Sequence, residues 1–176
     1  MAAKDFLIDL SKIDFSRPLA TLDDIRAVNP QRFEMEQLTA IVHLDHDAQL
    51  LIGYKDVRGD EFWARGHVPG CPLMPGVLIC EAAAQLCGFY CHAVDLVPHG
   101  FLGFGGIDDV RFRGPVRPGD RLVIIGKAER LRRRQPIFDT QAFVEGNMVF
   151  HGKIIGVPLT VSTADPDQTI GESQFK

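Results

Sequence analysis

The stretch that decides the fold runs from Gly66 to Asp95 and reads GHVPGCPLMPGVLICEAAAQLCGFYCHAVD. Its first eleven residues include three prolines and three glycines, which predicts a loop of defined shape. From Val77 onward the segment is rich in Ala, Leu and Cys, and Glu81 is its only charged residue before Asp95. Because such a segment is apolar nearly all the way round, it predicts a buried helix.

The segments on either side of this helix have the patterns of strands. Residues 37–58 alternate loosely around the polar turn 45–47, which predicts a β-hairpin. Upstream, Thr21 is expected to cap a short helix that ends at Asn29-Pro30. Further strand-like runs follow the buried helix at 101–107, 121–128, 137–144 and 148–157. One hydrophobic helix among antiparallel strands predicts an α+β fold, with the sheet wrapped around a central helix.

Length and composition predict one globular domain. The chain has 176 residues, enough for a single domain with a sizeable core. We expect that domain to span 1–176, with an N-terminal extension at 1–21, a core at about 22–158 and a polar tail at 160–176. A hydrophobic share of 45% and a charged share of 24% are ordinary for a globular protein. The net charge of −4 argues against a nucleic-acid partner.

The start of the chain and the cysteines indicate the compartment. No run of eighteen apolar residues occurs, and Asp5 and Asp9 interrupt the apolar start, which argues against a membrane span and a secretory signal. Cys80, Cys87 and Cys91 fall inside the predicted helix, where they could not pair without distorting it. Reduced thiols fit better than a disulfide framework, so we expect a cytoplasmic protein.

Glu81 and His67 are the candidate catalytic residues. A carboxylate on an apolar helix needs compensation for its lost hydration, and a loop histidine accepts protons near pH 7. Taken alone, each has an ordinary structural interpretation, as a hydrogen-bonded buried carboxylate and as a surface histidine. Together, a protonated glutamic acid facing a neutral imidazole would supply an acid and a base at working pH.

Gly76 adds a backbone donor to this pair. Its N–H is expected in the first turn of the helix, unpaired within the helix and backed by the positive end of the helix dipole. Such a donor stabilises the enolate-like oxygen that forms when a proton leaves the carbon next to a thioester carbonyl. The three groups fit β-elimination of water.

The run from His67 to Gln85 closely resembles the signature of the (3R)-hydroxyacyl-acyl-carrier-protein dehydratases of the hydroxymyristoyl type, and residues 104–120 resemble the family's following strand and turn. The similarity extends from about residue 22 to about residue 158. The resemblance implies a hotdog fold and a homodimer, often assembled as a trimer of dimers, with two active sites at the subunit interface. It implies neither a metal nor an organic cofactor.

The resemblance also implies roles for individual residues. His67 corresponds to the histidine that removes the α-proton, and Glu81 to the glutamate, supplied by the partner subunit, that protonates the leaving 3-hydroxyl. Gly76 corresponds to the backbone donor to the thioester carbonyl, and Gln85 to a glutamine that helps hold the carboxyl group. Pro75 is expected to contact substrate beside Gly76.

The chain departs from the family pattern at two places. Val68 stands where phenylalanine is common, so the pocket wall near the thioester is expected to differ. Gln31 stands within a Pro-Gln-Arg where the family has Pro-His-Arg, and Glu34 and Glu36 follow where apolar residues are usual. We expect these changes to affect the N-terminal packing, the mouth of the acyl tunnel and the assembly beyond a dimer.

Basic side chains gather between Arg111 and Arg134, where Asp120 and Glu129 are the only acidic residues. The ordinary interpretation is a solvated strand face. Because the family's partner, acyl carrier protein, is acidic, the resemblance favours a docking surface instead. The residues expected to contact the carrier are Arg111, Arg113, Arg132 and Arg133.

Two other functions stay open at this point. A thioesterase can have the same fold, and release of free thiol would identify it. A non-catalytic acyl-binding or scaffold protein would bind ligand without turnover. A metal site, built from the helix cysteines with His92 or from His43 and His46, is a weaker interpretation than core filler and turn residues.

Overall fold

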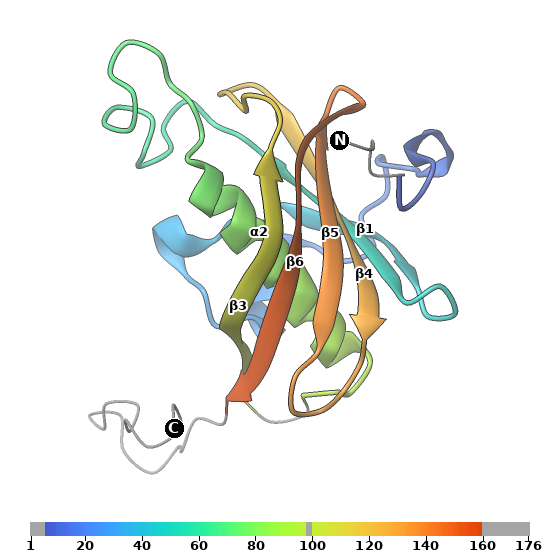
Figure 1. The fold of residues 1–176 in the computed structure, drawn as a ribbon. Helices are drawn as coiled ribbons and strands as arrows, with labels where there is room; N and C mark the ends of the chain where they lie inside the picture. The colour runs from blue at the N-terminus through green and yellow to red at the C-terminus, as the bar shows by residue number, and fades with distance from the viewer. Residues whose placement is uncertain (1–5, 98–99, 160–176) are drawn as a thin grey trace, which may run out of the picture.

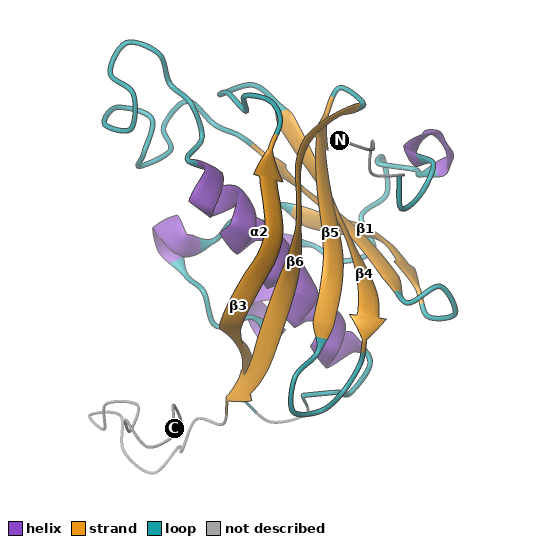
Figure 2. Ribbon diagram, in the orientation of Figure 1, coloured by secondary structure: helices purple, strands orange, loops and turns teal. Residues whose placement is uncertain are grey.

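The computed structural model describes residues 6–97 and 100–159, and its centre is a sheet curled around one helix (Figures 1 and 2). Within these residues six antiparallel strands follow the order β1-β2-β4-β5-β6-β3. The strands are β1 (Ala40–Asp45), β2 (Leu50–Asp56), β3 (Phe101–Phe112), β4 (Arg121–Arg130), β5 (Ile137–Val144) and β6 (Asn147–Leu159). The predicted α+β architecture is therefore present, and β1 and β3 are the edges of the sheet.

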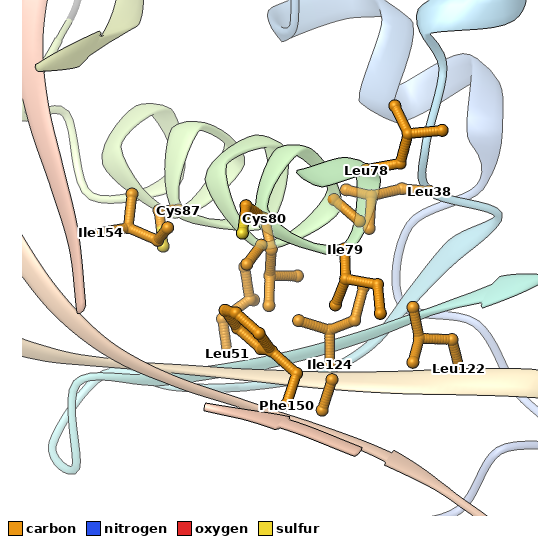
Figure 3. Packing of buried hydrophobic residues seen from close by; sticks show 14 of the residues in the cluster. Leu38, Leu51, Leu78, Ile79, Cys80, Cys87, Leu122, Ile124, Phe150 and Ile154 are labelled. Carbon is orange, nitrogen blue, oxygen red and sulfur yellow. The ribbon is translucent and has the colours of Figure 1, made fainter. Parts of the chain in front are cut away.

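The predicted buried helix is α2 (Gly76–Ala93), which lies across the concave face of the sheet (Figure 1). Its side chains pack against those of β2, β4 and β6, as Figure 3 shows for Cys80, Cys87 and Ile154. Leu86 is fully buried, and it can approach the sheet because a Cβ added at Gly53 would lie 2.9 Å from its Cδ1. A glycine in β2 thus makes room for the helix.

A short helix, α1 (Leu22–Val28), precedes the sheet where Thr21 predicted it. The Thr21 hydroxyl accepts from the Asp24 N–H, while the Asp24 carboxylate accepts from the Thr21 N–H, which completes a capping box. The helix ends at Val28, and Asn29 follows as its C-cap. A 3₁₀ turn, η2 (Phe33–Met35), then leads into β1.

The predicted hairpin is formed by β1 and β2, but β3 is longer than predicted. It continues to Phe112, five positions beyond the expected end at residue 107. The polar pair Asp108-Asp109 follows the expected end of the strand and lies where the β3–β6 pairing shifts register, with Asp109 at φ 52°. An exposed edge strand accommodates such a bulge because its outer side meets no neighbouring strand among the described residues.

The segment before α1 covers the outer face of the sheet. Adjacent residues of a strand point to opposite faces, so Leu51 contacts the α2 side while Leu50 and Ile52 form a second cluster on the outer side. The residues packed on that cluster from the N-terminal segment are Leu7, Ile8, Leu10, Ile13 and Phe15. The Leu7 N–H also donates to Gln141 Oε1 at 3.0 Å, which ties the segment to β5.

The predicted polar tail at 160–176 lies outside the described residues. Among the described helices, none combines the length and the apolar character needed to cross a membrane.

Candidate active site

His67 is an exposed residue in the loop between β2 and α2, and the backbone there is tied to the core. The N–H groups of Gly66 and His67 both donate to the Trp63 carbonyl, at 3.1 Å and 2.9 Å. Trp63 itself is buried. Further along the loop Met74 is also buried, and its N–H donates to the Val116 carbonyl at 2.8 Å. The imidazole therefore extends into solvent from an anchored loop.

A buried ion pair fixes the start of the same loop. Lys55 Nζ lies 2.9 Å from Glu61 Oε1, and the two side chains are 8% and 11% exposed. Val57 follows, with its N–H on the Asp120 carbonyl at 2.9 Å. Because removing one partner of a buried pair leaves the other charge uncompensated, the start of the loop needs both residues.

The His67 side chain lines an open, mostly apolar groove of about 530 Å³ at the N-terminal end of α2. The lining residues are His67, Leu73, Met74, Pro75, Gly76, Val77, Ile79, Phe112, Gly114, Pro115 and Val116. The structure thus brings together three of the predicted site residues, His67, Pro75 and Gly76. Val68, predicted to shape the same wall, is not among the lining residues.

Gly76 begins α2 in close contact with the end of β3. A Cβ added there would lie 2.7 Å from the Phe112 ring, so a larger residue at this position would displace that ring. Pro75 is the N-cap and gives no side-chain hydrogen bond to the helix. The Gly76 N–H is one of the first-turn donors that have no acceptor within an α-helix, and Gly76 lines the groove that contains His67.

Glu81 lies one and a half turns into α2 and is half-buried. Gln85, one turn further, donates from Nε2 to Glu81 Oε1 at 2.8 Å, and Gln31 donates to the same oxygen at 3.4 Å. Gln85 is itself held, since its Nε2 also reaches the Met35 carbonyl at 2.6 Å and its Oε1 accepts from the Gln37 N–H at 2.9 Å. These amides are the compensation that a carboxyl group on an apolar helix requires.

Glu81 faces a different cavity from His67. That cavity holds about 100 Å³ and lies between α2, the segment after α1 and the start of β3. Its lining includes Gln31, Glu81, Gln85, His92 and Phe101–Phe104. Within one chain, therefore, the two predicted catalytic residues line separate hollows, one at each end of β3.

The divergent segment at 30–38 is ordered by polar contacts. Glu36 accepts from Arg26 through Nε at 2.6 Å and Nη2 at 2.8 Å, and these bonds lower the pKa of Glu36. Glu34 is exposed, and Phe33 is 86% exposed at φ 57°. Of the two charges that depart from the family pattern, Glu34 thus lies in solvent, while Glu36 is 15% exposed and paired with Arg26. The segment is anchored through Gln85 and Arg26.

The four arginines expected to dock a carrier do not form one patch within the chain. Arg111 and Arg113 are exposed at the end of β3 beside Phe112, and Arg113 donates to His151 Nδ1 at 3.1 Å. Arg132 and Arg133 lie in the β4–β5 loop. The Gly156 N–H of β6 donates to the Pro136 carbonyl of that loop. Gly156 lies five residues, or roughly 17 Å along β6, from His151, the residue that pairs with Arg111.

The helix cysteines are core residues, as predicted. Cys80, Cys87 and Cys91 are buried and free, and burial raises the pKa of Cys80 to about 11 and that of Cys91 to about 12. Thiols protonated to such high pH are poor nucleophiles and poor metal ligands. Cys71 is exposed in the loop after His67.

Sequence reasoning missed three residues of these hollows. Phe112 covers Gly76, Gln31 touches Glu81, and His92 lines the Glu81 cavity. Gln31 had a signal, since it replaces the histidine of the family's Pro-His-Arg. His92 also had a signal, its helical spacing. It lies eleven positions after Glu81 and therefore on nearly the same face of α2.

Solved structures of known proteins share this architecture. The dehydratase heterocomplex ApeI:P from Xenorhabdus doucetiae superposes with a TM-score of 0.65 and 16% identity, covering 82% of this chain and 93% of that chain. A mutant thioesterase from Pseudomonas aeruginosa superposes with a TM-score of 0.60 and 16% identity, covering 81% and 98%. The predicted hotdog fold is thereby confirmed, and at such identities the likeness concerns the fold alone.

Sequence comparison goes further than the fold. The bifunctional enzyme LpxC/FabZ of Chlorobaculum tepidum is 36% identical over 139 residues, which cover 78% of this chain and 30% of that enzyme. The chain therefore corresponds to less than a third of this relative. Residues 29–153, most of the chain, match the FabA-like domain. The chain belongs to the FabA-like domain family.

Proposed function

We propose that the protein is a dehydratase that converts (3R)-3-hydroxyacyl thioesters of acyl carrier protein to trans-2-enoyl thioesters. The observation that carries this proposal is the placement of His67 with Gly76 in one hollow and of Glu81 with Gln85 in another, at opposite ends of β3. The site is incomplete in one chain and is completed by a second copy.

The exposed edge of β3 supports that second copy. Phe104, Ile107 and Phe112 are exposed large apolar residues along twelve residues of edge strand, a surface that in a single chain invites pairing. In an antiparallel β3–β3 pair, residues 101–104 of one copy lie beside the residue-112 end of the other. Residues 101–104 border the Glu81 cavity, and Phe112 borders the His67 groove. A two-fold pair therefore places the Glu81 cavity of one copy beside the His67 groove of the other, once at each end of the paired strands.

The joined site has the groups that β-elimination needs. His67 takes the proton from C2, the C2–H electrons form the C2–C3 double bond, and the C3–O bond breaks. Glu81 of the other copy gives its proton to the departing oxygen, and water leaves. The Gly76 N–H donates to the thioester oxygen while negative charge develops there, and the Gln85 amide holds the carboxyl group in place.

The same pairing supports carrier docking. Arg111 and Arg113 lie at the residue-112 end of β3, while Arg132 and Arg133 lie toward the residue-101 end. When two β3 strands pair antiparallel, Arg132 and Arg133 of one copy lie at the same end as Arg111 and Arg113 of the other. The result is one basic rim beside each joined site, which suits an acidic carrier.

A spectrophotometric assay tests the proposed function. Purified protein with 3-hydroxyacyl or trans-2-enoyl thioesters of several chain lengths should change enoyl absorbance in both directions. His67→Ala and Glu81→Gln should each lower kcat by at least about a hundredfold, because each removes a proton-transfer group, while circular dichroism stays unchanged. Near-wild-type turnover in either variant overturns the mechanism, and release of free thiol instead of enoyl product would identify a thioesterase.

A further inference from the structure

The Glu81 carboxyl group is held through one of its two oxygens. Its Oε1 accepts from Gln85 Nε2 at 2.8 Å and from Gln31 Nε2 at 3.4 Å. Within residues 6–97 and 100–159 no hydrogen-bond donor reaches its Oε2. The Gln85 amide has a fixed orientation, because its own oxygen accepts from the Gln37 N–H at 2.9 Å. Oε1 is therefore the accepting oxygen of this carboxyl group.

This arrangement decides which oxygen of Glu81 carries the proton. A proton on Oε1 would compete with two N–H groups for the lone pairs of that oxygen, so the proton belongs on Oε2. When that proton leaves, the carboxyl group becomes negative, and hydrogen bonds to an ionised acceptor are stronger than those to a neutral one. The two amides therefore favour the state that follows proton transfer.

The backbone that carries Gln31 is fixed in place. Asn29 Nδ2 donates to the Gln85 carbonyl at 3.0 Å, which fastens this segment to α2. Arg32 Nη1 donates to the Gln31 carbonyl at 2.6 Å and to the Asn29 carbonyl at 2.7 Å. The Gln31 side chain therefore extends toward Glu81 from a backbone that is held on both sides.

The Gln31 side chain contributes little to the fold. Among the described residues, its one side-chain hydrogen bond is the bond to Glu81, and its Oε1 is buried without a partner. A buried amide oxygen without a partner costs free energy, so an apolar side chain of the same length would suit the fold better. Gln85 differs, because it also binds the Met35 carbonyl and the Gln37 N–H. What the Gln31 amide supplies is the N–H that reaches the proposed acid.

We propose that Gln31 is a positioning residue for Glu81, which fixes Oε1 as the acceptor so that Oε2 presents the proton to the departing 3-hydroxyl. The inference rests on the proposed function, in which Glu81 is the acid. As the C3–O bond breaks, the Oε2–H bond breaks too, its proton goes to the departing oxygen, and its electron pair stays on the carboxylate. Gln31 stands where the family pattern has histidine, so this chain places an uncharged donor beside its acid.

Kinetics and stability of Gln31 variants test this role. Gln31→Met keeps the length of the side chain and removes its N–H groups, so kcat should fall about tenfold, the effect of one lost hydrogen bond to a charged group. KM for 3-hydroxyacyl pantetheine thioesters should stay the same, and the urea midpoint should be no lower than that of the wild type. Gln31→His, which has an N–H donor, should recover part of the lost kcat.

The matched control is Gln135→Met, at an exposed position in the β4–β5 loop, and it should leave all three quantities unchanged. A wild-type kcat in Gln31→Met overturns the inference. So does a Gln31→His variant that is no faster than Gln31→Met, because the N–H donor then has no part in the effect.

NMR of the Gln31 side-chain amide separates this inference from the proposed reaction. Its two proton signals are assigned by their loss in Gln31→Met, and the bond to Glu81 should move one of them downfield. That signal should return toward the position of free amides in Glu81→Ala and stay in place in His67→Ala. If it does so while no thioester is turned over, the dehydratase proposal fails and the contact stands. A signal that is the same in Glu81→Ala as in the wild type overturns the inference, even if the wild type is an active dehydratase.

Discussion

At the scale of single residues, the proposed site depends on Gln85 as much as on the proposed proton-transfer groups. Its amide nitrogen holds Glu81 and the Met35 carbonyl, and its amide oxygen holds the Gln37 N–H. The residue is 3% exposed; its bond to the Gln37 N–H is buried, and its bonds to Glu81 and Met35 are partly buried. One side chain therefore positions the proposed acid and fastens the divergent segment to α2.

Gln85→Leu should lower both stability and turnover. The substitution leaves the buried Gln37 N–H and the partly buried Met35 carbonyl without the Gln85 partner, and we expect a loss of about 2 kcal/mol in the free energy of unfolding. It also frees the Glu81 carboxyl group, so kcat should fall about tenfold or more while KM changes little. Urea titration and the enoyl assay measure the two effects.

The exposed Gln135→Leu in the β4–β5 loop is the matched control and should leave both quantities unchanged. A Gln85→Leu variant that is less stable and yet has the wild-type kcat would show that Gln85 has only a structural role.

The residues that could be predicted from sequence are those close together in the chain. His67, Gly76, Glu81 and Gln85 fall within nineteen positions, where loop chemistry and helical spacing fix their relation. Phe112 reaches Gly76 from 36 positions away, because of the close approach of β3 to the start of α2. Such a contact has no local pattern, so only the folded chain shows it.

At the scale of elements, the segment before α1 stabilises the outer face of the sheet. Five of its apolar side chains pack on Leu50, Ile52, Ile125 and Phe143. The sequence predicted an extension at 1–21 without a packing role, because its apolar residues have no clear period. The segment packs on the face of the strands opposite the core. That face can be identified only once the strands have been placed in the sheet.

Replacing Ile8 and Ile13 together with serine should loosen this cover. Each substitution exchanges a partly buried apolar side chain for a polar one, at about 1 kcal/mol apiece. We expect the double variant to melt about 6 °C lower by calorimetry and to bind more of a hydrophobic dye. Leu19→Ser, at a position 60% exposed, is the control. An unchanged Tm would mean that the segment does not stabilise the sheet.

At the scale of the whole molecule, the proposed assembly is a two-fold pair. A two-fold pair would account for two features of the chain. One is the exposed edge strand of twelve residues, and the other is the pair of half-sites at its opposite ends. The bulge at Asp109 and the full length of β3 were not predicted, because the polar pair Asp108-Asp109 interrupts the apolar pattern after residue 107. The dimer itself was implied only by the family resemblance.

The proposed basic rim gives a prediction for the substrate carrier. Reversing Arg132 and Arg133 to glutamate should raise KM about tenfold or more for carrier-protein substrates, because like charges then oppose an acidic carrier. KM for short pantetheine thioesters should stay the same, since these lack the carrier. Arg17→Glu, exposed in the N-terminal segment, is the control charge reversal. Equal effects on both substrates would show that these arginines do not dock the carrier.

The central claim is that each active site takes His67 from one chain and Glu81 from another. Mixing the His67→Ala and Glu81→Gln proteins, after reversible dissociation, tests it directly. Random mixing makes half of the dimers mixed, and each mixed dimer has one site with both native residues, so dehydration should return to about a quarter of the wild-type rate. A mixture that stays as inactive as its two components, although mass spectrometry shows mixed dimers, would contradict the shared site.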